Sequence, residues 1–296
     1  MNLKKIATSL LAGLLAVTCI LPLASCSNAP AGTKPGDDTI VQTGEAKVKV
    51  LKMGRALASV VRTKDATIVI DTGDEEHNQD VVTFLTEKGI NTVDAVILTN
   101  YSKKCIGGIP ALLSSGITVK AVYGAGYEKD SSTYTLFENA LTSYNLTLEK
   151  ISAEKTLTFG DLSLTCYPAT KDYSTLDDEN DEGNSMAVAM NFGANSMLFT
   201  SRIAGDRLKE LTTQISGKDF DCIMAPNFGA YDDNLPAFLA AAKAEYGVIV
   251  ASNSNPPADA TVTAMISAGI KEGNFFITRD GSVEISCDGK TFSMKQ

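Results

Sequence analysis

Apolar and polar residues alternate with two different periods along residues 47–296. A period of two, which is typical of strands, begins at residues 47–52, where valine alternates with lysine. A period near 3.6 marks helices such as residues 79–88, which Gly89 ends. Most strand-like runs are followed by a helix-like run, so this part of the chain is expected to form an α/β domain.

The same reading gives the order of the elements. Strands are expected at residues 47–52, 58–62, 67–70, 95–98, 118–123, 187–192, 196–200, 221–225 and 248–251, with hairpins at residues 156–167 and at the C-terminus through Asp280-Gly281 and Asp288-Gly289. Helices are expected at residues 79–88, 109–113, 132–144, 206–215, 235–244 and 260–268. Two strand-rich halves with helices suggest a sandwich of two sheets covered by helices, although periodicity alone also fits other α/β layerings.

The N-terminus has the pattern of a secretory signal. Lys4 and Lys5 precede an apolar run at residues 6–23, and small residues follow it. The stretch Leu23-Ala24-Ser25-Cys26 resembles the bacterial lipobox, in which the cysteine is acylated and becomes the first residue. An uncleaved membrane anchor is the alternative, since the run is nearly long enough to span a bilayer. Either way the rest of the protein is expected outside the cytoplasm. In a processed lipoprotein, acylated Cys26 would hold it to the membrane.

Three segments follow from this pattern. Residues 1–25 are the expected signal peptide, and residues 26–46 are rich in Pro, Gly, Ser and Asp, which is typical of a flexible tether. Residues 47–296 are the expected folded domain and contain no second apolar run of spanning length.

Charge and composition narrow the possible partners. The chain has a formal net charge of −9, and a signal peptide with two lysines and no acidic residue leaves −9 − 2 = −11 after cleavage. A field of this sign repels the phosphate backbone, so nucleic acid is not an expected partner. Trp is absent, which weakens the case for a carbohydrate-stacking surface.

The cysteines do not form a metal or disulfide framework that spacing can identify. Cys19 belongs to the signal peptide and Cys26 is the lipidation candidate. The remaining cysteines are widely spaced and contain no C-x-x-C pair, which disfavours a zinc ribbon. They are Cys105, Cys166, Cys222 and Cys287. Buried free thiols are expected for the last three, which lie in apolar runs, but a disulfide remains open.

Two loops resemble motifs of the metallo-β-lactamase superfamily. Residues 68–73 read IVIDTG, similar to the strand-ending Asp-Thr-Gly of that family, and residues 99–108 read TNYSKKCIGG. The second motif of the family is Thr-His-x-His-x-Asp-His-x-Gly-Gly, with Asp at the second His in the branch related to the competence protein ComEC. Further blocks resembling that branch follow in the same order, at residues 53–58, 184–186, 199–202, 225–229, 252–257 and 278–281. The resemblance covers residues 47–292 and implies a four-layer αββα sandwich.

The metal-binding residues that the resemblance implies are replaced. The family holds one or two divalent metals, usually zinc, with imidazoles and carboxylates, and the metal generates hydroxide near neutral pH. The corresponding positions here carry Asn100, Ser102 and Cys105 in the loop, Lys104 at its aspartate, Arg202 at the metal-bridging aspartate, and Asn227-Phe228 at the late histidine pair. The single histidine of the chain, His77, lies in an acidic loop away from these motifs. No metal and no other cofactor is therefore expected.

The remaining residues allow more than one role. Asp71 is expected either to brace the loop, as the family aspartate does, or to bond nearby amides as an ordinary strand-end residue. Lys104 and Arg202 stand where the family holds metals, so they either form a structural plug with Asp71 or Asp74 or bind a small anionic ligand such as a phosphate or carboxylate.

Two further features each have a structural and a functional interpretation. Cys105 either packs or acts as a nucleophile activated by a neighbouring lysine. The acidic run at residues 177–182 partly resembles a calcium loop, but a solvated loop is the simpler interpretation.

Three functions remain in competition. The first is a surface-anchored, non-catalytic protein that keeps a hydrolase scaffold and binds a ligand or a protein partner. The second is a hydrolase with a non-standard site. The third is a structural or interaction lipoprotein whose cleft is closed.

Overall fold

The computed structural model describes residues 44–173 and 182–296. The expected signal peptide, Cys26 and nearly all of the expected tether lie outside these residues, as does the acidic run at residues 177–182 except for its last residue. Among the described residues, no helix has the length and apolar character needed to cross a membrane.

The first sheet has eight strands in the order β17-β16-β1-β2-β3-β5-β7-β8. Strand β3 runs parallel to β5, β5 to β7 and β7 to β8, whereas the other neighbours are antiparallel. The strands are β1 (Ala46–Val50), β2 (Ala58–Arg62), β3 (Thr67–Thr72), β5 (Ala95–Leu98), β7 (Val122–Ala125), β8 (Leu148–Ile151), β16 (Val283–Cys287) and β17 (Phe292–Lys295).

The second sheet has seven strands in the order β15-β14-β13-β12-β11-β10-β9. Strands β12 to β15 are parallel, and β9 to β12 form an antiparallel meander. The strands are β9 (Lys155–Phe159), β10 (Leu162–Tyr167), β11 (Ala187–Phe192), β12 (Asn195–Phe199), β13 (Cys222–Met224), β14 (Tyr246–Ile249) and β15 (Phe275–Ile277). A small third sheet joins β4 (Thr92–Val93) to β6 (Thr118–Val119).

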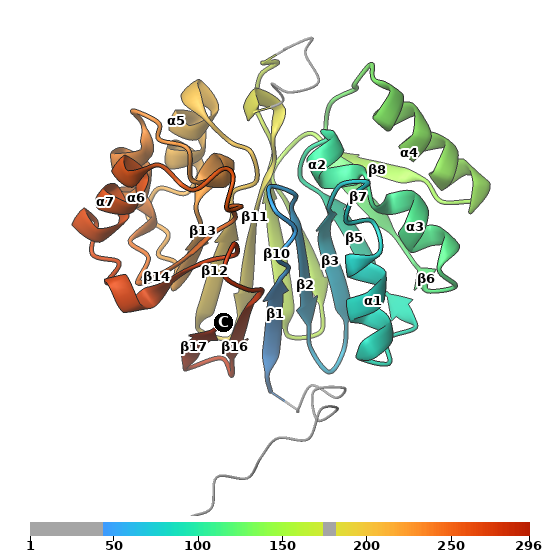
Figure 1. Cartoon of the computed structure of the whole chain (residues 1–296), viewed down its shortest axis with the longest axis horizontal. Helices are drawn as coiled ribbons and strands as arrows, with labels where there is room; N and C mark the ends of the chain where they lie inside the picture. Colours follow the sequence, from blue (N-terminus) through green and yellow to red (C-terminus); the bar gives the residue numbers. More distant parts are fainter. Residues whose placement is uncertain (1–43, 174–181) are drawn as a thin grey trace, which may run out of the picture. The chain divides into compact units, whose positions relative to one another are not determined.

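Helices cover the outer face of each large sheet (Figure 1). On the first sheet these are α1 (Asp80–Glu87), α3 (Ile109–Ser114) and α4 (Ser132–Ser143), and on the second α5 (Gly205–Gln214), α6 (Leu235–Ala242) and α7 (Asp259–Ser267). The short helix α2 (Lys103–Ile106) and three 3₁₀ turns (Glu182–Asn184, Pro226–Gly229 and Glu272–Asn274) complete the described elements. The four layers are those of an αββα sandwich, so the predicted fold class is confirmed.

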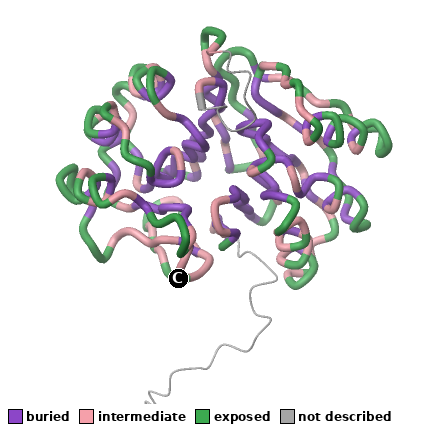
Figure 2. Tube along the Cα trace, turned by 45° about the horizontal axis from the view of Figure 1, so that its top comes forward, coloured by how far each residue is buried: buried purple, intermediate pink, exposed green. Residues whose placement is uncertain are grey.

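The central strands are buried on both faces because each large sheet lies between the other sheet and a helix layer. Every residue of β2 and of β5 is buried, and Figure 2 shows the buried residues gathered in the middle of the trace. One apolar core joins Val48 and Ile97 of the first sheet to Met190 and Met197 of the second. A second core lies between the second sheet and α5, α6 and α7. Burial of this apolar surface is the main force that holds the layers together.

Two sequence predictions are wrong in detail. The strand expected at residues 118–123 is divided, because β6 pairs with β4 in the small sheet while β7 joins the first large sheet. The turn at Asp280-Gly281 does not close a hairpin, because β15 pairs with β14 in one sheet and β16 pairs with β1 in the other. An Asp-Gly turn predicts a change of direction, but β16 pairs with β1, which is at the start of the domain's sequence. The hairpin at Asp288-Gly289, between β16 and β17, is confirmed.

Candidate functional site

Five loops meet where parallel strands of the two sheets end. Strands β3 and β5 of the first sheet run parallel, and so do β12, β13 and β14 of the second. Parallel strands place their carboxyl ends at one edge of a sheet, where ligands of α/β proteins are usually bound. The loops after these strands contain most of the candidate residues: Asp71 and Asp74, the loop 99–108, Arg202, Asn227 and Ser252.

Asp71 forms the floor of the site. Its side chain is buried, and Oδ1 accepts a hydrogen bond from the Thr99 backbone N–H at 2.8 Å while Oδ2 lies 2.5 Å from Thr99 Oγ1. The same hydroxyl lies 2.6 Å from Ser201 Oγ, so one chain of contacts joins the ends of both sheets. Burial raises the pKa of Asp71 to about 7, although the hydrogen bonds from Thr99 oppose this shift. The carboxyl group braces the start of the loop 99–108 and does not face the cleft.

Hydrogen bonds of buried polar atoms, both within the loop and to neighbouring segments, hold the loop 99–108. Asn100 is fully buried, donates to Ser185 Oγ at 2.9 Å and accepts from the Ser102 backbone N–H at 2.7 Å. Cys105 is fully buried, and its Sγ lies 3.6 Å from Ser102 Oγ. Gly108 has no room for a side chain, since a Cβ there would lie 2.1 Å from the Thr72 carbonyl oxygen. The loop therefore packs tightly against the end of β3.

The other three cysteines are in the core, as expected. Cys166, Cys222 and Cys287 are buried free thiols. Burial raises the pKa of Cys166 and that of Cys287 to about 12, so neither thiol ionises near neutral pH.

Backbone strain is concentrated at the same strand ends. Six non-glycine residues of the described chain have positive φ, and four of them lie here: Asp71 (57°), Ser201 (55°), Asn227 (44°) and Phe228 (57°). Residues with side chains avoid this region, and such strain is often found at ligand sites. The Asn227 N–H donates to the Ser201 carbonyl at 3.1 Å, which ties the strained turns to each other.

A cavity of about 520 Å³ opens above this floor. Its cationic lining residues are Arg55, Lys103, Lys104 and Arg202, and its acidic ones are Asp74 and Glu76. The formal balance is +4 − 2 = +2, in a chain whose net charge is −9. Two of the cations lie over the ring of Phe228. The ring centroid is 4.7 Å from the Arg55 guanidinium carbon and 6.0 Å from that of Arg202. The cleft is thus a positively charged pocket on an acidic protein.

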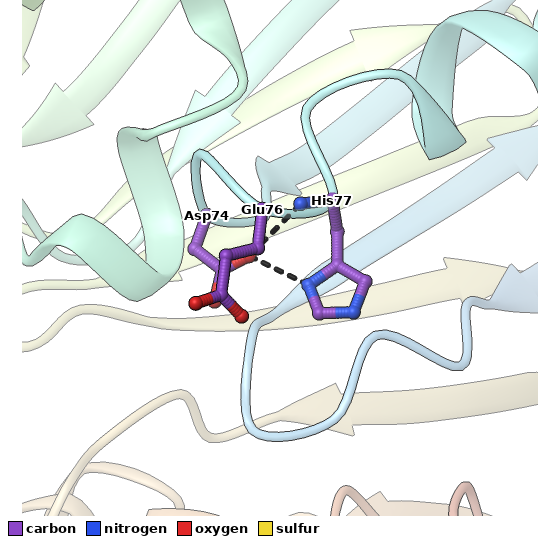
Figure 3. Close-up of side chains that lie close together, drawn as sticks. All are labelled: Asp74, Glu76 and His77. Atoms are coloured by element: carbon purple, nitrogen blue, oxygen red, sulfur yellow. Dashed lines mark hydrogen bonds and ion pairs between the residues drawn. The ribbon is translucent and has the colours of Figure 1, made fainter.

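Asp74 lines the cavity next to Glu76 and His77, and Figure 3 shows these three side chains. Its Oδ1 lies 2.7 Å from His77 Nδ1, and its Oδ2 accepts a hydrogen bond from Lys104 Nζ at 2.9 Å. These two partners hold the pKa of the Asp74 carboxyl below its usual value, against the opposing effect of burial. Lys104 therefore pairs with Asp74 and not with Asp71, which is one of the two pairings that the plug interpretation allows.

The donor set at the strand ends does not fit the metals that the fold family holds. The candidate positions present two amides, a hydroxyl, a thiol, an ammonium and a guanidinium. The cationic groups cannot ligate a metal ion, and the thiol, Cys105, is buried beneath the cavity. Within residues 44–173 and 182–296, one cluster offers metal-ligand chemistry, formed by Asp74, Glu76 and His77. Both Asp74 oxygens already contact His77 and Lys104, so this cluster is better explained as the ion-pair network that positions Lys104.

The structure brings some candidates together and separates others. Ser102, Lys104, Arg202 and Asn227 line the one cavity, whereas Asp71, Asn100 and Cys105 are buried beneath it. Sequence reasoning missed other residues of the cleft, and it placed His77 away from the site. The missed lining residues include Arg55, Glu76, His77 and Lys103. The position of Asp74 and His77 just after the Asp-Thr-Gly strand end was the signal available for the cleft wall.

Solved structures with the metallo-β-lactamase fold resemble this chain. The metallo-β-lactamase fold protein YhfI from Bacillus subtilis is 13% identical with a TM-score of 0.53, over 85% of this chain and 99% of that one. Zn²⁺-bound PqqB from Methylobacterium extorquens is 12% identical with a TM-score of 0.54, over 81% of this chain and 99% of that one. The metal-dependent hydrolase Tm1679 is 12% identical with a TM-score of 0.51, over 82% and 98%. No protein-family model and no curated protein sequence matches the chain. At these identities the likeness establishes the fold alone.

Proposed function

We propose that this chain is a surface-anchored, non-catalytic protein of the metallo-β-lactamase fold that binds a small anion in its cleft. The anion is a phosphate or a carboxylate, held by cations where relatives of this fold hold metals. The observation that carries the proposal is the lining of the cavity by Lys104 and Arg202, together with Arg55, in an acidic protein.

The chemistry of these side chains supports an anionic ligand. Arg presents a planar fork of donors that matches the oxygens of phosphate and carboxylate, while Lys adds a point charge. Asp74 fixes Lys104 at 2.9 Å, so part of the entropy loss on binding has already occurred before a ligand arrives. The ion pair does not fill the cleft, because about 520 Å³ remains beside it.

The cellular location of the protein is also part of the proposal. Acylation of Cys26 after signal cleavage would hold the domain at the extracytoplasmic face of a bacterial membrane, on a tether of residues 26–46. The ordered sequence blocks described above favour the branch related to the competence protein ComEC. Labelling with a radioactive fatty acid should be lost in Cys26→Ala, and persistence of the label would contradict lipid anchoring through Cys26.

Binding of inorganic phosphate by the full chain, measured by isothermal titration calorimetry, tests the ligand. Lys104→Ala should weaken phosphate binding by about tenfold, since a charged hydrogen bond is lost. Lys120→Ala is the matched control, because Lys120 also pairs with an aspartate, Asp94, at 2.7 Å, but lies away from the cavity. Stoichiometric zinc together with hydrolytic turnover, or an unchanged affinity in Lys104→Ala, would contradict the proposal.

A hydrolase with a non-standard site is the second candidate, and the Asp74–His77 pair favours it. A carboxylate on Nδ1 leaves Nε2 of a neutral imidazole to accept a proton, as in general-base catalysis. His77 lines the cleft, so a bound ester and a water would lie within its reach. Turnover of bis(p-nitrophenyl) phosphate that falls by about 100-fold in His77→Gln, and is unchanged in Lys120→Ala, would support this candidate. Absence of turnover in the parent chain would dismiss it.

A further inference from the structure

A second depression continues the cleft along the outer surface of the first sheet. It has a volume of about 640 Å³ and lies between the loop 99–108, the start of α3 and the helix α4. We call it the α4 groove; its apolar lining residues are Ile106, Pro110, Ala111, Leu136 and Ala140. Asp74, Glu76, Lys103 and Lys104 line both the cleft and the α4 groove, so the two spaces meet at two lysines and two acidic residues.

Helix α4 has one face in the core and a second face along the groove. Tyr134, Phe137 and Leu141 point into the core. The second face combines the apolar Leu136 and Ala140 with polar residues three or four positions from them: Thr133, Asn139 and Ser143. Leu136 is 62% exposed, which makes it the most exposed of the large hydrophobic residues in the described part of the chain. An apolar side chain in this position favours a ligand that covers it.

We propose that the anion bound in the cleft is the head of a single-chain amphiphile whose alkyl tail lies in the α4 groove. The inference rests on the proposed anion-binding function and adds the class of ligand to it. Lys103 and Lys104 stand at the junction, where the charged head of such a molecule meets its tail.

The charges around the groove select the kind of tail. Glu75 and Glu76 are exposed at its edge, so a tail that ends in a second anionic group is repelled. An uncharged alkyl tail instead gains free energy by covering Leu136 and Ala140. Full burial of one methylene corresponds to about a fourfold change in affinity, and the open groove should give about twofold for each methylene.

The test is a homologous series measured by isothermal titration calorimetry on the full chain. The probes are inorganic phosphate, butyl phosphate, hexyl phosphate and octyl phosphate, all below their micelle concentrations. From butyl to octyl phosphate the affinity should rise by roughly 15-fold in the parent chain. Leu136→Asp should remove most of this gain while leaving the affinity for inorganic phosphate unchanged.

A matched variant controls for nonspecific binding of the tail. Ile266 on α7 is also an exposed large hydrophobic residue, at 40%, and does not line the groove, so Ile266→Asp should keep the full chain-length dependence. The apolar N-terminal run is present in all three proteins, so any difference between them belongs to the substituted site.

The outcomes separate the inference from the function on which it rests. Phosphate binding without a chain-length effect, or a chain-length effect that persists in Leu136→Asp, would overturn the amphiphile and leave the anion site standing. If neither inorganic phosphate nor any alkyl phosphate binds, both proposals fail.

Discussion

Two aspartates three positions apart, one at the end of β3 and one in the loop that follows it, have opposite environments. Asp71 is buried among Thr99 and Ser201 at the floor of the site, and its pKa is raised to about 7. Asp74 faces the cleft between Lys104 and His77, and its pKa is lowered. A carboxyl group therefore stabilises the loop 99–108 at position 71 and pairs with Lys104 at position 74.

The comparison shows which part of the site can change without loss of the fold. The floor joins the ends of the two sheets through short, buried hydrogen bonds that water cannot replace. The wall uses an ion pair in which the side chain of Lys104 is 35% exposed and that of Asp74 is 8% exposed, and the carboxylate has His77 as a second partner. Lys104 is therefore expected to contribute less to stability than the buried contacts of the floor.

The largest expected effect is the pH dependence of stability that Asp71 produces. Its folded-state pKa, about 7, lies above the unfolded value near 3.8, so the folded state binds the proton more tightly. The contribution of Asp71 is greatest below about pH 4, declines between pH 4 and pH 7 and is lost above, by as much as about 4 kcal/mol. Asp71→Asn, which tolerates positive φ, should lack this decline when urea unfolding is followed from pH 4 to pH 8. Parallel curves for parent and variant would show that Asp71 does not titrate in this way.

The second prediction removes the floor contacts altogether. At pH 5, Asp71→Ala should lower the free energy of unfolding by about 3 kcal/mol, because the Thr99 N–H loses its acceptor and alanine disfavours positive φ. Asp71→Asn should lower it by less than about 1 kcal/mol, since the amide keeps an acceptor for Thr99. Urea midpoints compare the two variants, and an equal loss in both would mean that the contacts of the carboxyl group are not what stabilises the floor.

The third prediction concerns Lys104, which pairs with Asp74 at the wall of the cleft. Lys104→Ala should change the free energy of unfolding by less than about 1 kcal/mol, because the pair with Asp74 is partly exposed. Its main effect should be the tenfold loss of phosphate affinity described above. A loss of stability similar to that of Asp71→Ala would mean that Lys104 is a structural plug.

The smallest effect is expected from Asp74→Asn. Removal of this charge changes the formal balance of the cleft lining from +2 to +3, so phosphate should bind about two- to threefold more tightly. Its effect on stability has the opposite sign to that of Asp71. A carboxyl with a lowered pKa stabilises the fold above its unfolded pKa and loses that contribution as the pH falls. The amide oxygen of Asn can still accept a hydrogen bond from Lys104 Nζ, so weaker phosphate binding in the calorimeter would mean that the charge of Asp74, and not only its oxygen, is needed to position Lys104.

The sequence predicted the layers of the fold better than the connections between them. Short, continuous apolar runs located β2, β5 and β11 at their observed bounds, because strands that are buried on both faces leave such runs in the sequence. The division of residues 118–123 between two sheets was not predictable, since it depends on tertiary pairing with β4 and β5. The pairing of β16 with β1 was hidden for the same reason.

The site was predicted in part, for a related reason. The resemblance of ordered loops identified Ser102, Lys104, Arg202 and Asn227, which line the cavity. It could not assign Arg55, because the role of that residue depends on its stacking with Phe228 from the other half of the chain. It also set His77 apart, although a hydrogen bond to Asp74 brings that ring to the cleft wall. Contacts between loops that are distant in sequence leave no local pattern.

One crystallographic measurement tests directly the proposal that the cations of this cleft bind an oxyanion. Crystals of the protein soaked in tungstate, a phosphate-like oxyanion, would be measured at the tungsten absorption edge, with a second crystal soaked in Zn²⁺ and measured at the zinc edge. The account predicts a tungsten peak within hydrogen-bond distance of Lys104 Nζ and the Arg202 guanidinium, and no zinc peak among the strand-end loops. A zinc ion held by these loops, or tungstate bound only elsewhere on the surface, would contradict it.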